Sequence, residues 1–161
     1  MTSARPSRKQ ARRDALFLLY QTEVTDLEMK DLVEGQRLRE GYGPDEFTVA
    51  AVSGVLAARE DLDVELGAHS TSWAIDRIAP LERSILRLAL WEIDSEATPP
   101  EVAIDEAVRL AKRYSTDEAG ALVNGILGAV VRDREAEAGE IEPDADTEEP
   151  DADEIEPDTD A

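Results

Sequence analysis

The sequence predicts an all-α protein, and three observations support this class. Apolar residues recur three and four positions apart through most of residues 7–134, which is the spacing of one helical face. No stretch alternates apolar and polar residues for long enough to indicate a strand. Proline or glycine stands at the edges of several apolar segments, where these residues start or end helices. We therefore expect about seven helices.

The expected helices follow one another with short connections. They span residues 7–24, 29–40, 44–67, 72–78, 80–94, 99–114 and 115–134. Pro44 suits a first turn because proline lacks a donor that would be unpaired there, and the acids behind it suit the positive end of a helix. The Gly41-Tyr42-Gly43 turn ends the second helix. Ser115 with Glu118 predicts a capping box for the last one.

The segment 80–94 is expected at the centre of the protein, because apolar residues cover more than half of its circumference. Glu92 falls inside this apolar arc, where an unpaired carboxylate would be costly, so it needs an internal donor or a basic residue of a bound protein. Trp91 borders the arc and either packs in the bundle or anchors a partner. In the last helix, Gly125 and Gly128 predict close approach of a neighbour.

Charge is distributed very unevenly along the 161 residues, whose formal net charge is −21. Residues 1–13 hold five cations and no acid, whereas residues 135–161 hold fourteen acids and no Lys or Arg. The acidic stretch has too few apolar residues to offset its ordering entropy. We therefore expect a helical domain over residues 1–134 and a disordered acidic tail over residues 135–161.

Several function classes are disfavoured by composition. The absence of cysteine excludes disulfides, thiolate zinc sites and cysteine nucleophiles. His69 has no second ligand at metal-binding spacing, and no phosphate loop, nucleophile elbow or catalytic dyad occurs. We expect no cofactor, no metal and no enzymatic activity. Neither a signal peptide nor a transmembrane span is recognisable, which predicts a cytoplasmic protein without a membrane partner.

The basic residues near the N-terminus are candidate RNA contacts. They are Arg5, Arg8, Lys9, Arg12 and Arg13. Pairs of them lie one helical turn apart and form a broad cationic face, and cations displace condensed counterions from RNA phosphates. A solvated basic N-terminus without a ligand is the alternative.

Three segments together resemble the NusB family of transcription antitermination factors, over roughly residues 5–132. They are ARRDALFLLYQTEV at 11–24, PLERSILRLALWEI at 80–93 and PPEVAIDEAVRLAKRYSTDEAGALVNGIL at 99–127. The resemblance implies two packed helical bundles and a heterodimer with the small-subunit ribosomal protein NusE. That pair recognises a single-stranded boxA element in the leader RNA of ribosomal RNA operons and holds it near the transcription elongation complex. The implied protein is an RNA-binding adaptor that carries out no chemistry.

The resemblance also implies two surfaces. The junction of the last two helices would complete the RNA surface with Lys112, Arg113, Tyr114, Glu118 and Leu122. Tyr114 would either stack on a base or belong to the core. Glu82, Trp91 and Glu92 mark the expected partner-binding surface.

Other interpretations remain open at this point. The chain could be a helical protein-interaction bundle, such as a homodimer, without RNA affinity. A NusB-like accessory module of ribosomal RNA cytosine methyltransferases is less favoured, because no nucleotide-cofactor domain is recognisable in the chain. The acidic tail could compete with weakly bound RNA at the basic N-terminus, or it could only aid solubility.

Overall fold

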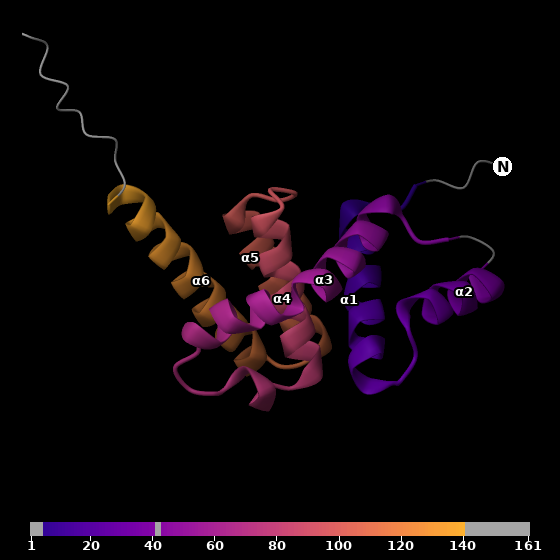
Figure 1. Cartoon of the computed structure of the whole chain (residues 1–161), viewed down its shortest axis with the longest axis horizontal. Helices are drawn as coiled ribbons and strands as arrows, with labels where there is room; N and C mark the ends of the chain where they lie inside the picture. Colours follow the sequence, from indigo (N-terminus) through magenta and orange to yellow (C-terminus); the bar gives the residue numbers. More distant parts are fainter. Residues whose placement is uncertain (1–4, 41–42, 141–161) are drawn as a thin grey trace, which may run out of the picture.

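The computed structural model describes residues 5–40 and 43–140, and every regular element in these ranges is helical (Figure 1). The elements are α1 (Arg8–Val24), α2 (Met29–Glu40), α3 (Glu46–Ala68), the short 3₁₀ helix η1 (Ile75–Arg77), α4 (Pro80–Asp94), α5 (Pro100–Tyr114) and α6 (Asp117–Glu140). The predicted all-α class is confirmed. The short helix expected at 72–78 is a single 3₁₀ turn.

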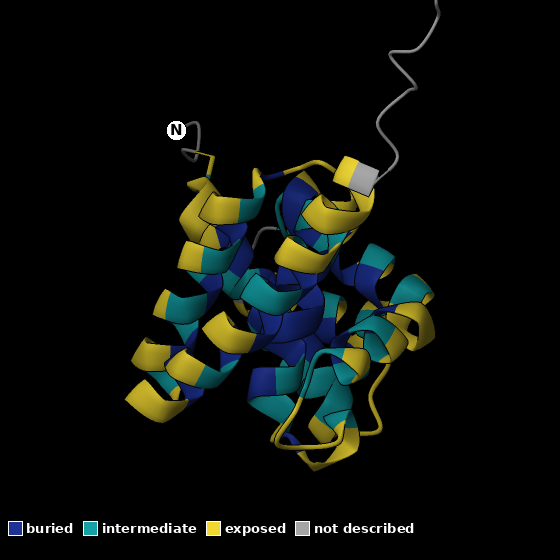
Figure 2. Ribbon diagram, turned by 90° about the vertical axis from the view of Figure 1, so that its left-hand side faces the viewer, coloured by how far each residue is buried: buried dark blue, intermediate teal, exposed yellow. Residues whose placement is uncertain are grey.

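Helix α4 is the centre of the molecule, because it packs against α1, α3, α5 and α6. Helices α1 and α2 lie on one side of it and α5 and α6 pack on each other on the other side, while α3 crosses α4 from one group to the other (Figure 1). Buried residues concentrate where these two groups meet (Figure 2). Leu86, Leu88 and Leu90 of α4 are almost fully buried, as the wide apolar arc of this segment predicted.

Two helix starts differ from the expectation, and the capping side chains explain both. Asp45 caps α3 by accepting a hydrogen bond from the Phe47 amide at 3.0 Å, so Pro44 precedes the helix instead of forming its first turn. Thr116 accepts from the Ala119 amide at 3.0 Å at the start of α6. The predicted capping box of Ser115 and Glu118 is therefore wrong.

The last helix is longer than the sequence pattern suggested. Arg134, the expected end of the helical region, lies inside α6, which continues to Glu140. Its guanidinium forms ion pairs with Glu65 on α3 and Asp94 on α4, both at 2.6 Å. These contacts hold α6 against α3 and α4 at the position of Arg134. The remainder of the predicted tail, residues 141–161, lies outside the described residues.

The close helix approaches occur at other glycines than those predicted. A Cβ at Gly125 would meet nothing within 4 Å, and one at Gly128 would meet only the side chain of Arg132 on the same helix. At Gly54 on α3, by contrast, a Cβ would lie 2.0 Å from Nε1 of Trp91. Gly54 therefore lets the half-buried Trp91 indole lie directly on α3, which supports packing as the role of this residue.

The described residues include no helix long and apolar enough to cross a membrane. Among the same residues, no three His, Asp or Glu side chains are grouped so that they could hold a metal ion.

Candidate nucleic-acid interface

The first turn of α1 carries cations although this is an unfavourable place for them. Ser7 caps the helix by accepting a hydrogen bond from the Gln10 amide at 3.2 Å. Arg8 and Lys9 follow, and the first turn contains no acid. Because the N-terminus of a helix is its positive end, cations there are mildly destabilising. Helix stability therefore does not account for their presence.

A hollow of about 370 Å³ separates the first turns of α1 from the second half of α5. Its lining residues are Ser7, Lys9, Gln10, Arg13, Glu106, Arg109, Leu110, Arg113 and Tyr114. Four of these side chains are cationic, namely Lys9, Arg13, Arg109 and Arg113, and one is a carboxylate. We call this hollow the basic groove. It joins the N-terminal cations to Arg113 and Tyr114, two residues that the sequence placed at a separate helix junction.

The cations of the basic groove are only weakly neutralised. Arg13 has no hydrogen-bond or ion-pair partner among the described residues, and Lys9 Nζ lies 3.8 Å from Glu106 Oε1. Arg109 pairs with Asp105 at 3.2 Å, but both side chains are 60% exposed. An exposed pair of this kind adds little free energy and exchanges readily for another anion. These cations are therefore available to a phosphate backbone.

Arg12 corrects the predicted RNA surface because its side chain is buried. It donates to both carboxylate oxygens of Glu92, from Nε at 2.9 and 3.1 Å and from Nη2 to Oε1 at 2.8 Å. Thr98 also donates to Glu92, at 2.7 Å. Arg12 is thus unable to reach RNA. Glu92 receives its partner from inside the protein, so it does not belong to a partner-binding surface either.

Arg5 and Arg8 turn toward the start of α3. Arg5 donates to Asp45 at 3.0 Å and to Glu46 at 3.2 Å, although its side chain is 72% exposed. The hydrogen bond from Arg5 also holds the pKa of the Asp45 carboxyl below its usual range. The Arg8 guanidinium lies 4.1 Å from the centroid of the Phe47 ring, a cation–π distance. These two residues lie at or just before the first turn of α1, but they do not line the basic groove.

Tyr114 and Lys112 have packing roles beside the groove. The Tyr114 ring meets Phe17 edge to face with centroids 5.0 Å apart, and the Arg113 guanidinium lies 5.5 Å from its centroid. Tyr114 is half-buried, so it forms a wall of the groove. The exposed Lys112 runs its stem over Gly120, where a Cβ would lie 2.7 Å from Lys112 Cγ.

The remaining predicted residues lie in a second hollow, of about 350 Å³, between η1 and the start of α6. Glu82, Glu118 and Leu122 line it together with Trp73, which is 54% exposed, and Arg77. Ser115 donates a hydrogen bond to Glu82 at the edge of this hollow. Of the predicted RNA residues, the structure thus places some in the basic groove and only Glu118 and Leu122 in the second hollow, while the others line neither.

Several lining residues were not among the predicted site residues, notably Arg109, Glu106 and Trp73. Trp73 was placed only within the short helix expected at 72–78, and its bulky aromatic side chain was an available signal. The position of Arg109 beside α1 depends on how α5 packs, and no local pattern encodes it.

Helical packing around a central helix, with a cationic groove on an acidic body, defines a small all-helical protein suited to binding a polyanion. The NusB family model matches residues 9–132, and the chain belongs to the NusB family. The resemblance drawn from the three sequence segments is confirmed.

Curated relatives agree over nearly their whole length. The transcription antitermination protein NusB of Bacillus velezensis is 38% identical over 130 residues, which cover 80% of this chain and 98% of that protein. The protein of the same name from a Thermoanaerobacter species is 34% identical over 135 residues, 83% of this chain and 96% of that protein.

A solved structure of the antitermination factors NusB and NusE in complex with double-stranded RNA is also similar. Its TM-score is 0.69 at 26% identity, and the match covers 78% of this chain and 96% of that one. In that structure, the NusB protein is seen together with both a protein and an RNA partner.

Proposed function

We propose that this chain is an RNA-binding transcription antitermination adaptor that acts with NusE on boxA-like single-stranded leader RNA of ribosomal RNA operons. It works in the cytoplasm at the transcription elongation complex and has no enzymatic role. Family membership and the names of the relatives support the proposal. The NusB and NusE complex with RNA supports both partners.

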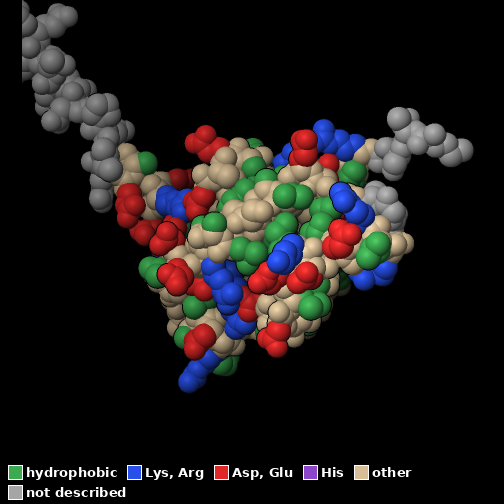
Figure 3. All heavy atoms as spheres, turned by 45° about the vertical axis from the view of Figure 1, so that its right-hand side comes forward, with side chains coloured by type: hydrophobic (Ala, Val, Ile, Leu, Met, Phe, Trp, Pro, Cys, Tyr) green, Lys and Arg blue, Asp and Glu red, His purple; other side chains and the backbone are tan. Residues whose placement is uncertain are grey.

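The observation that carries the proposal is the basic groove. The whole chain has a formal net charge of −21, so its net electrostatic field opposes the binding of RNA. On the face shown in Figure 3, Lys and Arg side chains alternate with Asp and Glu and no broad area has one sign. The groove differs because it gathers four cations around one carboxylate. It therefore offers phosphates a cationic binding site on a protein whose net charge is negative.

We assign the phosphate contacts to Lys9, Arg13, Arg109 and Arg113, with Lys112 at the border. Arg5 and Arg8 can add to the field near the groove once their exposed pairs exchange for phosphate. The second hollow has a different character, because Glu82 and Glu118 flank apolar groups. We assign it, with Leu122, to a basic segment of the protein partner.

We also infer that the described helical region acts as one RNA-binding domain and that the acidic tail is not part of it. The family match ends at residue 132, near the expected boundary at 134. The helical extension to Glu140 lies beyond that match.

A salt-dependent RNA titration tests the proposed function. The double variant Arg13→Ala/Arg113→Ala removes two groove cations, whereas the control Arg37→Ala/Arg132→Ala removes two exposed cations elsewhere. Binding of a fluorescent boxA-like RNA is measured by anisotropy at several salt concentrations, with and without NusE. Each single-strand phosphate contact contributes about 0.7 to the slope of log affinity against log salt, so we expect the groove variant to lose about 1.4.

The control should keep the parent slope within error. A folded groove variant that binds leader RNA as tightly as the parent would contradict the proposed site. If the parent binds no RNA with or without NusE, the interaction-bundle alternative is favoured instead.

A further inference from the structure

Glu106 is an unusual component of the basic groove. Its side chain is only 15% exposed, yet it lines the groove among the four cations. Its two ion-pair contacts are Lys9 Nζ at 3.8 Å and Arg12 Nη1 at 3.7 Å. Both distances exceed the usual N–H···O range of about 2.7–3.2 Å. The carboxylate therefore has two cationic neighbours but no hydrogen bond to any of the described residues, so its oxygens can accept hydrogen bonds from a ligand.

Glu106 is positioned by Arg12, a buried residue on the protein side of the groove wall. Arg12 is held by hydrogen bonds from its Nε and Nη2 to the buried Glu92 carboxylate. Its Nη1 is left to face Glu106. The carboxylate thus faces a fixed guanidinium at a defined place on the groove wall.

A carboxylate at this place is unfavourable for binding phosphate alone, because it repels the RNA backbone. It is favourable for binding a base edge, since a carboxylate only accepts hydrogen bonds and so selects N–H donors. Guanine presents two parallel donors, N1–H and the N2 amino group, on its Watson–Crick edge. Uracil presents one N–H between two carbonyl oxygens, which a carboxylate repels. Unpaired bases are commonly recognised on these edges in single-stranded RNA.

We propose that Glu106 reads the Watson–Crick edge of an unpaired guanine base in the basic groove. The inference rests on the proposed RNA-binding function and adds a base-specific contact to it. Leu110 and Tyr114 provide an apolar wall for the base, and the groove cations hold the flanking phosphates. A hollow of about 370 Å³ lies in the size range of small-molecule sites, which admits one base.

Inosine provides the test, because it matches guanine except for the missing N2 amino group. Three fluorescent 12-mers are compared: alternating uridine and guanosine, alternating uridine and inosine, and uridine alone. The alternating design brings a guanine within reach of Glu106 in every binding register. For the parent protein we expect the guanosine RNA to bind about tenfold more tightly than the inosine RNA, as for the loss of one hydrogen bond to a charged group.

Glu106→Gln should lower this ratio to below about twofold, because the amide offers a weaker acceptor and a competing donor. Its affinity for the all-uridine RNA should stay constant or rise, since one repulsive charge is removed. The matched control is Glu101→Gln, an exposed glutamate in the first turn of the same helix that does not line the groove. It should keep the parent ratio.

Glu106→Asp provides a second test in case Glu106→Gln does not fold. It keeps the charge near Arg12 but withdraws the carboxylate by one methylene, so it should also lower the ratio while the salt slope stays unchanged. An unchanged ratio in either folded variant overturns the role of Glu106. If the parent binds none of the three RNAs, the proposed function fails. If the parent binds all three with a ratio near one, only the present inference fails.

Discussion

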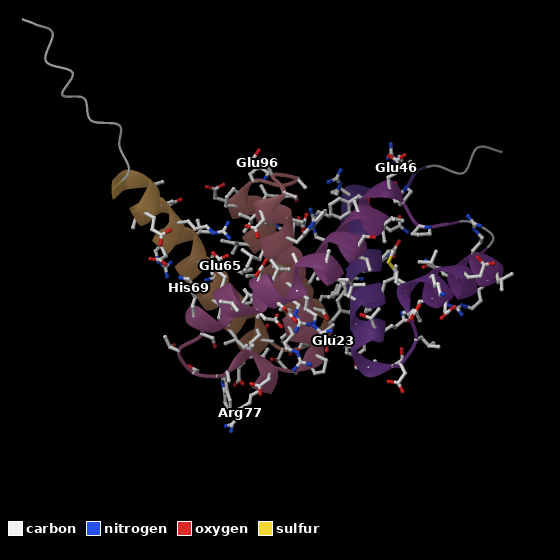
Figure 4. All side chains as sticks on the ribbon, viewed as in Figure 1. Glu23, Glu46, Glu65, His69, Arg77 and Glu96 are labelled. Atoms are coloured by element: carbon white, nitrogen blue, oxygen red, sulfur yellow. The ribbon has the colours of Figure 1, made fainter. Side chains whose placement is uncertain are left out.

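Arginine-rich clusters lie at both ends of helix α1, but only the cluster at the C-terminal end is neutralised by acids inside the protein. At its N-terminal end, the groove cations face an open hollow with one carboxylate among them. At its C-terminal end, Glu23 lies between α1 and α4 (Figure 4) and collects three arginines. Arg59 and Arg83 each form an ion pair with Glu23 at 3.1 Å. Arg87 also donates a hydrogen bond to Glu23.

The Glu23 cluster is closed by a second acid. Asp63 accepts two hydrogen bonds from Arg87, at 2.7 and 2.8 Å. Burial alone would raise the pKa of Glu23, but the hydrogen bond and charge of Arg87, helped by Arg59 and Arg83, hold it below its ordinary value. A similar number of arginines thus forms a stabilising ion-pair cluster at one end of α1 and a candidate binding surface at the other. The number of acids that tertiary packing brings to each cluster decides the difference.

The largest expected effect is the loss of stability on breaking the Glu23 cluster. Glu23→Ala leaves Arg87 and its neighbours without their shared acceptor, and removing one partner of a buried ion pair costs about 3 kcal/mol. Urea unfolding followed by circular dichroism measures this loss. The control Glu28→Ala removes an exposed acid, and its effect should stay below about 0.5 kcal/mol. RNA affinity per folded molecule should not change, and a loss of affinity would mean that the two ends are coupled.

The end of α3 provides a smaller, pH-dependent effect. His69 donates from Nδ1 to the Glu65 carbonyl at 2.8 Å, and its Nε2 lies 3.0 Å from Asp133 Oδ2 on α6 (Figure 4). The backbone hydrogen bond to Glu65 and the Asp133 carboxylate raise the pKa of His69. Because the folded pKa is raised, the added stability is complete below the unfolded value near 6.5 and is lost as the pH rises through the folded value.

His69→Gln should therefore lower the melting temperature at about pH 5.5 and have less effect at about pH 8.5. Asp133→Asn should reduce this pH dependence without abolishing it, because the contact to Glu65, the larger cause of the raised pKa, stays in place. A destabilisation by His69→Gln that is equal at both pH values would show that the imidazole packs without titrating.

Sequence periodicity was sufficient for most of the fold. The arc of α4 predicted its central position because burial on all sides requires apolar residues on all sides. The pairing of Arg12 with Glu92 was only half predicted. Glu92 was recognised inside an apolar arc, but Arg12 lies one turn before the buried Leu16 and carried the same signal. Two opposite charges inside two apolar arcs can satisfy each other, and that rule would have removed Arg12 from the predicted RNA surface.

The candidate site was predictable only in part, for a different reason. Helical spacing placed Lys9 and Arg13 on one face, and the family resemblance added Arg113 and Tyr114. The meeting of these residues with Arg109 and Glu106 depends on the packing of α5 beside α1 through α4. Such a juxtaposition has no local signature, because the pattern of either helix alone does not show which residues of the other helix it will face.

The smallest expected effect on stability sharpens the comparison between the two ends of α1. Lys9→Ala removes a first-turn cation that opposes the helix dipole, together with a contact of 3.8 Å to Glu106. These contributions oppose each other, so the free energy of unfolding should change by less than about 0.5 kcal/mol. The same change should lower the salt slope of RNA binding by about 0.7. Urea unfolding and anisotropy titration of one preparation measure both quantities. A stability loss approaching that of Glu23→Ala would mean that the N-terminal cations stabilise the fold, as the arginines around Glu23 do at the other end of the helix.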